Sequence, residues 1–398
     1  MKSMTAIVIG GGVTGLSTAY HLARKKYGRI ILLDKEAVGD GSSSRAAGII
    51  TGLLWSETGV LARKKCLALF RELSKELEGY SFRDVGCLNL YGPQSWRDAE
   101  KLLPLYRRLA IPFEIIDAAE IRRRWPALTP HEEFVGLFDP LGGYSEPDEY
   151  IPALTRKNRE LGVEVCEGRQ VFGFLTHNGR ITGVKTNAGD IEADAVICTV
   201  LAWTLKVIEP LGMQLPLKAF VHQRYLTQPL SSPMKIPAVN ANELGGYVRP
   251  ALGNRLLAGV ETAEREECRV PSREFRQNSL SAPRSLKAEI NRKYGSLVPA
   301  LRNIEWESEK VGLITFSLDG EPILGPISNV PGFYVGTAFH SGGFAYNPVA
   351  GLLLAEYVAD GHTSIDVTAF SPDRFEQKNV EKYLAATFRQ RDAFERRH

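Results

Sequence analysis

The stretch that decides the fold is Thr5-Ala-Ile-Val-Ile-Gly-Gly-Gly-Val-Thr-Gly-Leu16, close to the start of the chain. The apolar run Ala6 to Ile9 predicts a buried parallel strand, and a glycine-spaced turn leads from it into an apolar-periodic helix. A second apolar run, Ile30 to Leu33, ends in Asp34. Strand, turn, helix, second strand and acid in this order are typical of a dinucleotide-binding βαβ unit.

Each residue of the turn has a physical task in such a unit. Gly10 permits the tight turn, Gly12 lets the backbone approach a pyrophosphate, and Gly15 lets the helix pack closely on the strand. We expect the phosphates at the helix N-terminus beside Val13 and Thr14, where N–H groups and the helix dipole favour negative charge.

Asp34 and its neighbour Lys35 narrow the choice of nucleotide. An acid that binds the adenosine ribose disfavours a 2′-phosphate, so NADP is disfavoured while NAD and FAD both remain. The following run, Gly39 to Gly48, contains small and hydroxyl residues with a single cation, and its backbone can approach a phosphate or a ring system. We expect cofactor contacts from Ser42, Ser43, Arg45, Ala46, Ala47 and Gly48.

Length and composition bound the class of protein. The 398 residues favour two domains, and 44% hydrophobic with 24% charged residues are ordinary for a soluble globular protein. A net charge of +3 gives no argument for nucleic acid or an anionic membrane as a partner. Five scattered cysteines without metal spacing predict reduced thiols in a cytoplasm and no metal. Neither a signal peptide nor a membrane span is expected.

Further motifs are spread over essentially the whole chain. They are Asp139-Pro-Leu-Gly-Gly-Tyr-Ser-Glu-Pro147, Gly183 to Asn187, Ala195 to Trp203, Asp319 to Gly325, Gly332 to Phe344 and Asp373 to Phe375. With the N-terminal fingerprint, they resemble the D-amino-acid oxidase superfamily of FAD enzymes. Within it, the chain is most similar to the branch of glycine oxidase, sarcosine oxidase and the flavin subunits of archaeal proline dehydrogenases.

The resemblance implies a fold of α/β and α+β parts: a Rossmann-type FAD-binding domain and a discontinuous, mixed-sheet substrate-binding domain. The FAD-binding domain would comprise residues 1–85, 146–210 and 311–398, and the substrate-binding domain residues 86–145 and 211–310. The coarse pattern predicts helices near 57–77, 94–110, 151–161 and 349–358, strands near 86–91 and 191–199, and a hairpin at Asn178-Gly179.

The chemistry implied by the resemblance is oxidation of a C–N bond by hydride transfer from the substrate to flavin N5. The reduced ring then carries negative charge near N1 and O2, which a helix N-terminus can stabilise. The turn before the last apolar helix fits this role, and we expect flavin contacts from Ser341, Gly342, Gly343 and Phe344. Val171 matches the family position beside the adenine, with core packing as the alternative, and Trp203 is a flavin contact or a packing residue.

The resemblance also predicts FAD held without a covalent bond. Dimethylglycine dehydrogenase-like members attach flavin to a histidine at the position of Arg45. Monomeric sarcosine oxidases use a cysteine near the position of Gly312. Neither nucleophile is present here.

A carboxylate substrate in this family is held by a cation, and a guanidinium matches its geometry. The family's arginine and lysine positions correspond to Ser341 and Ala345 here. Arg249, with Tyr247 on the same strand face, is therefore the first candidate for this catalytic-site role, and a surface arginine on an edge strand is the alternative. Arg224 is the second candidate.

His222 and His340 are the histidines nearest the expected substrate site, and each is either a base or a hydrogen-bonded structural residue. The electron acceptor is unknown. Sarcosine oxidases carry a lysine in the substrate-domain sheet that helps oxygen react, and no lysine occurs between Ile236 and Leu286 here. This absence favours a dehydrogenase, although glycine oxidases lack that lysine too.

Two other functions remain open. A 2-hydroxy-acid or polyol-phosphate dehydrogenase on the same fold would need a general base within hydrogen-bond distance of the substrate oxygen. A flavin subunit would be active only with a partner chain, and the basic C-terminal helix, Asn379 to Arg397, is a candidate contact in a homo- or hetero-oligomer.

Overall fold

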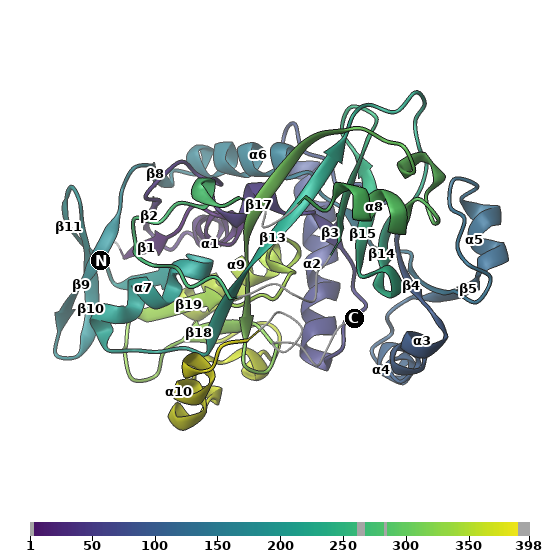
Figure 1. Ribbon diagram of the computed structural model, residues 1–398. Helices are drawn as coiled ribbons and strands as arrows, with labels where there is room; N and C mark the ends of the chain where they lie inside the picture. The colour runs from purple at the N-terminus through teal and green to yellow at the C-terminus, as the bar shows by residue number, and fades with distance from the viewer. Residues whose placement is uncertain (1–3, 261–266, 282–284, 389–398) are drawn as a thin grey trace.

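The computed structural model describes residues 4–260, 267–281 and 285–388 (Figure 1). Two large sheets, with helices between and around them, form a mixed α/β architecture in which a Rossmann-type unit adjoins a second, mainly antiparallel sheet. The long strands β13 (Leu217–Thr227) and β17 (Trp306–Ser317) cross the middle of the view beside the Rossmann-type unit. The predicted fold class is confirmed.

The first sheet has the order β18-β19-β12-β1-β2-β8. Its strands are β1 (Thr5–Ile9), β2 (Arg29–Leu33), β8 (Glu164–Cys166), β12 (Ala195–Cys198), β18 (Ile323–Pro326) and β19 (Phe333–Thr337). All neighbouring pairs are parallel except β18 with β19. Because parallel strands share one direction, the carboxyl ends of β1, β2, β12 and β19 meet at one edge, where α/β sheets bind ligands.

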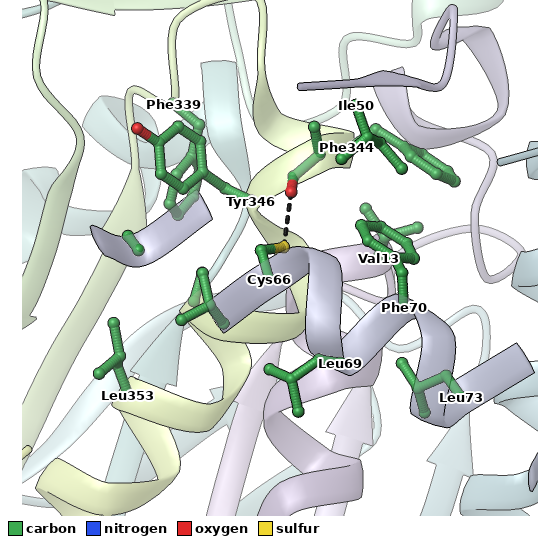
Figure 2. Packing of buried hydrophobic residues seen from close by; sticks show 14 of the residues in the cluster. Val13, Ile50, Cys66, Leu69, Phe70, Leu73, Phe339, Phe344, Tyr346 and Leu353 are labelled. Carbon is green, nitrogen blue, oxygen red and sulfur yellow. Dashed lines mark hydrogen bonds between the residues drawn. The ribbon is translucent and has the colours of Figure 1, made fainter. Parts of the chain in front are cut away.

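Helices α1 (Val13–Arg24) and α9 (Gly343–Ala359) pack together beside this sheet. A Cβ added to Gly351 would lie 2.4 Å from the backbone carbon of Ser17, so glycine sets the distance between the helices. Helix α2 (Glu57–Glu76) packs on the same α9, and Figure 2 shows its apolar side chains against those of α9. There the thiol of Cys66 donates to the carbonyl oxygen of Ala345 at 2.7 Å.

The second sheet has the order β17-β13-β16-β15-β14-β4-β6-β5. Its remaining strands are β4 (Cys87–Tyr91), β5 (Glu114–Asp117), β6 (Val135–Asp139), β14 (Ala238–Ala241), β15 (Gly246–Ala251) and β16 (Arg255–Val260). Strand pairing thus joins residues 87–139 with residues 217–317. The expected domain junction at 310/311 falls inside β17, whose pairing with β13 continues to Ser317.

The remaining strands and α-helices belong to neither large sheet. They are β3 (Ile49–Ile50), β7 (Gly143–Tyr144), β9 (Val171–His177), β10 (Arg180–Thr186), β11 (Gly189–Glu192), α3 (Pro93–Glu100), α4 (Leu103–Arg108), α5 (Ala118–Arg124), α6 (Pro147–Glu160), α7 (Thr204–Ile208), α8 (Lys287–Tyr294) and α10 (Gln377–Ala385). The hairpin β9–β10 turns at Asn178 and Gly179, with φ of 50° and 76°, which confirms that prediction. Among residues 4–260, 267–281 and 285–388, no helix has both the length and the apolar character needed to cross a membrane.

Three sequence predictions need correction. The helix predicted near 94–110 is two helices, because Pro104 lacks an N–H and its ring would clash with the carbonyl of Glu100. The strand predicted near 191–199 is split between β11 and β12, and between them the Asp194 carboxylate accepts the N–H of Thr5, at the start of β1, at 2.8 Å. The C-terminal helix ends at Ala385, and the predicted part beyond residue 388 lies outside the described residues.

We expect Gly351→Ala to lower the free energy of unfolding by about 1–3 kcal/mol, because the added methyl group would force α1 and α9 apart. Urea unfolding of the purified protein measures this change. Gly173→Ala is the matched control, since its Cβ would meet the Lys185 side chain at an ordinary 3.5 Å. Equal stability of the two variants would contradict the close packing of α1 on α9.

Candidate active site

A cavity of about 580 Å³ lies between the carboxyl edge of the Rossmann sheet and the inner face of the second sheet. This size is within the ordinary range for a cofactor or small-molecule site. Every predicted cofactor residue except Gly15 lines it: Gly10, Gly12, Val13, Thr14, Asp34, Lys35, Ser42, Ser43, Arg45, Ala46, Ala47, Gly48, Val171, Trp203, Ser341, Gly342, Gly343 and Phe344.

The turn between β1 and α1 closes tightly on itself. Gly10 has φ +104°, and a Cβ on Gly15 would lie 1.9 Å from the carbonyl oxygen of Gly10. Gly15 therefore packs the helix on the strand and does not face the cavity, which is the task expected of it. The backbone N–H of Val13 donates to the Ser43 hydroxyl at 3.0 Å, so the helix start is joined to the Gly39–Gly48 loop.

Asp34 lies at the end of β2 with its carboxylate held by backbone groups. One oxygen accepts the N–H of Gly11 at 2.7 Å and the other accepts the N–H of Glu36 at 2.8 Å. Burial raises the pKa of this carboxyl group. The ammonium of Lys35 donates to the carbonyl oxygen of Arg273 at 2.8 Å and lies 4.4 Å from the ring centre of Trp203.

A segment that the sequence did not identify, residues 273–279, crosses this end of the cavity. The Gln277 amide donates to the Ser42 hydroxyl at 2.9 Å, and Arg276 pairs with Glu36 at 2.9 Å. These partners are more than 230 positions apart along the chain, so no local pattern could indicate their contact.

The two family positions for covalent flavin attachment lie side by side. Arg45 donates to the carbonyl oxygen of Gly41 at 2.6 Å, and burial lowers the pKa of its guanidinium. A Cβ on Gly312 would lie 2.8 Å from Cδ of Arg45, and both residues line the cavity.

The N-terminus of α9 forms another part of the wall. Gly342 precedes the helix and provides no side-chain cap, so by helix geometry its first N–H groups lack intrahelical partners. His340 has φ 58°, and its Nδ1 accepts the N–H of Ser341 at 2.8 Å. Its ring stands edge-on to Phe316 with centroids 4.6 Å apart.

The opposite wall comes from the second sheet. His222 on β13 and Tyr247 on β15 both line the cavity, and the His222 Nε2 and Tyr247 Oη atoms are 3.0 Å apart. A Cβ on Gly259 of the neighbouring β16 would lie 2.4 Å from Tyr247 Oη, so glycine makes room for the phenol. This pair offers donors and acceptors to a small polar substrate.

A family comparison identifies the family of the chain. The model of the family described as FAD dependent oxidoreductase, DAO, matches residues 5–357. The chain belongs to this family.

Proteins of known activity are similar over nearly the whole chain. Sarcosine oxidase subunit beta of Arthrobacter sp. is 26% identical, over 94% of this chain and 92% of that protein. 4-Methylaminobutanoate oxidase (formaldehyde-forming) of Paenarthrobacter nicotinovorans is 26% identical over 96% of this chain, which spans only 47% of that protein. The crystal structure of L-proline dehydrogenase from P. horikoshii has a TM-score of 0.87, with 26% identity and coverage of 94% and 98%.

The residues of this chain fit the FAD of the DAO family. Gly12 leaves bare backbone in the cavity wall where a pyrophosphate would approach, and α9 presents an uncapped N-terminus to the cavity. A buried cation that the sequence did not identify, Arg63 on α2, also lines the wall. The sequence pattern that could have identified it is an arginine on the otherwise apolar face of a helix, with Val60, Leu67 and Phe70.

The structure does not support Arg249 as the carboxylate-binding residue. Its side chain is fully buried, does not line the cavity, and donates to both carboxylate oxygens of Glu146 at 2.7 and 2.9 Å. Arg224, the second candidate, donates to the carbonyl oxygens of Ser44 and Arg45 at 3.1 and 3.2 Å. Strand periodicity placed Arg249 on the face of Tyr247, but only the folded chain brings Glu146 to it.

We expect Arg249→Met to lower the free energy of unfolding by about 3–5 kcal/mol, because Glu146 would stay buried without its partner. The double variant Arg249→Met/Glu146→Leu should recover most of this loss, since it removes both charges. Chemical denaturation measures these values. Arg255→Met, in an exposed pair with Glu307, is the control and should change stability by less than about 1 kcal/mol. Normal stability with weakened substrate binding would instead restore Arg249 as a substrate contact.

Proposed function

We propose that this DAO-family protein oxidises the C–N bond of a small amino or imino acid or a secondary amine. The observation that carries the proposal is a single cavity lined by the FAD-binding turn, the α9 N-terminus and the His222–Tyr247 pair. The relatives support this substrate class, because their names refer to sarcosine, 4-methylaminobutanoate and L-proline.

Bound FAD would accept the two electrons of the oxidation. The chain orients the substrate and sets the electrostatic potential around the flavin. The first N–H groups of α9 favour negative charge beside them. Tyr247 and His222 can orient the amine or carboxylate of a substrate between the two sheets. An amine that binds deprotonated needs no strong protein base, so neither His222 nor His340 is required to remove a proton.

A dehydrogenase is favoured over an oxidase. Among the described residues that line the cavity, Lys35 is the only lysine, and its ammonium is held by the carbonyl of Arg273 at the ribose end. No lysine of the second sheet is therefore available to help oxygen react there, and we propose a quinone, dye or partner subunit as acceptor. We also propose dissociable FAD in a cytoplasmic protein.

Two alternatives have support of their own. His222, which lines the cavity within hydrogen-bond distance of Tyr247, supports a hydroxy-acid dehydrogenase, because that reaction needs a base near the substrate oxygen. The name sarcosine oxidase subunit beta supports a flavin subunit that works with a partner chain.

We expect anaerobic addition of an amine substrate to bleach the flavin absorbance of the holoenzyme. The panel contains D- and L-amino acids, L-proline, sarcosine, glycine, 4-methylaminobutanoate and 2-hydroxy acids. Admission of air should reoxidise the bleached protein more slowly than a soluble quinone does. Bleaching by hydroxy acids alone would overturn the proposal, and bleaching that appears only with a co-purified chain would establish the subunit alternative.

Tyr247→Phe should raise the dissociation constant of the bleaching substrate about 2- to 12-fold, the effect of one hydrogen bond of about 0.5–1.5 kcal/mol. Stopped-flow reduction at several substrate concentrations measures this constant. Tyr334→Phe, on β19 and outside the cavity wall, is the matched control. Equal constants for both variants would remove Tyr247 from the substrate site.

A further inference from the structure

We propose that Arg63 and the N-terminus of α9 form one anion site, which stabilises the negative edge of the flavin ring when the ring is reduced. The inference rests on the proposed placement of the ring against Ser341 to Phe344. It assigns a role to a cation on α2 that no sequence motif of the chain includes.

Arg63 is a buried charge without a balancing group. Its side chain is 4% exposed and lines the cavity, and its Nε has no hydrogen-bond partner among the described residues. The guanidinium carbon lies 4.1 Å from the ring centre of Tyr346. Because a buried ion loses its hydration, buried charges are normally paired, and an unpaired one in a cavity wall indicates an anionic ligand.

The groups around Arg63 do not supply that anion. Burial raises the pKa of the Tyr346 phenol and raises the pKa of the Cys66 thiol to about 12, so both remain neutral. Glu321, which also acts electrostatically on Tyr346, accepts the indole N–H of Trp55 at 2.9 Å. In the part of the chain that the structure describes, no carboxylate forms an ion pair with Arg63.

The guanidinium lies directly beside the start of α9. A Cβ on Gly342 would lie 2.3 Å from Nη2 of Arg63, so glycine at the N-cap makes space for the cation. Helix α9 has 17 residues, and its N-terminus carries the positive end of the helix dipole. Two positive groups in contact repel each other unless they share an anion, and the cavity is where that anion can lie.

The anion we assign is the flavin ring edge and not the substrate carboxylate. Arg63 and Gly342 both belong to helices of the FAD-binding unit, whose side chains pack together around Cys66 and Phe344 (Figure 2). The polar groups offered to a substrate, His222 and Tyr247, come from the second sheet. A fixed cation on the cofactor side favours the reduced, anionic form of the ring and therefore raises its reduction potential.

The test compares holoenzymes with Arg63→Met, Arg63→Lys and the control Lys65→Met, whose lysine is exposed on the same helix. Sulfite titration gives the dissociation constant of the flavin–sulfite adduct, and anaerobic dye equilibration gives the midpoint potential. Arg63→Met should weaken sulfite binding about 10- to 100-fold, the effect of one charge-assisted hydrogen bond. It should lower the two-electron potential by about 30–60 mV, the same fold-change converted. Arg63→Lys should lose less, and Lys65→Met should stay within about twofold of the unaltered protein.

Unchanged potential in Arg63→Met would overturn the proposal. Weaker sulfite binding at an unchanged potential would also overturn it, in favour of a site for incoming anions. Gly342→Ala serves as the test if Arg63→Met fails to fold or to take up FAD. This variant keeps every charge but displaces the Arg63 guanidinium, so the midpoint potential of its flavin must still fall. These readouts need no substrate, so they stand apart from the outcome of the substrate panel.

Discussion

The buried ion pair between Arg249 and Glu146 joins the second sheet to the Rossmann-type unit and constrains how the two meet. Arg249 lies on β15 of the second sheet, and Glu146 immediately precedes α6, a helix of the Rossmann-type unit. The guanidinium also donates to the carbonyl oxygen of Ala47 at 2.5 Å, and the N–H of Leu252 donates to Glu146 at 3.2 Å. Because a planar guanidinium binds a carboxylate in one orientation, the pair fixes direction as well as distance.

Hydrogen bonds from cationic side chains also hold the loop that lines the cavity between the sheets. Residues 40–48 contain one short 3-10 helix, Ser42–Arg45, and otherwise no regular structure, so most of their carbonyl groups need other partners. Cations of the second sheet and of the loop itself provide them: Arg45 on Gly41, Arg224 on Ser44 and Arg45, Lys310 on Ser44 and Arg249 on Ala47. The loop thus keeps its shape, and its small side chains leave the cavity open. Arginines that resemble substrate ligands in the sequence are, in the fold, the supports of this loop.

The buried cations among the described residues therefore differ in whether a carboxylate neutralises their charge. Lys218 is as deeply buried as Arg249, and it is paired with Glu267 at 2.6 Å on the side of the second sheet that faces α10. Arg63 is the buried cation in the cavity wall that has no carboxylate among the described residues. The contrast separates groups that hold the fold from a group that is available to a ligand.

Local periodicity determined much of this protein, because β1, α1, β2, the Asn178-Gly179 hairpin and α9 depend on residues a few positions apart. The glycine spacing and Asp34 likewise identified the cofactor wall, since each residue there acts through its own backbone or carboxylate. The sequence named Tyr247 and His222, which line the cavity, but it could not give the partner or the role of Arg249. Those depend on Glu146, 103 positions away, and on which long-range neighbour neutralises each buried charge. Only the tertiary structure decides that, because pairing is settled by distance in space and burial, neither of which has a period along the chain.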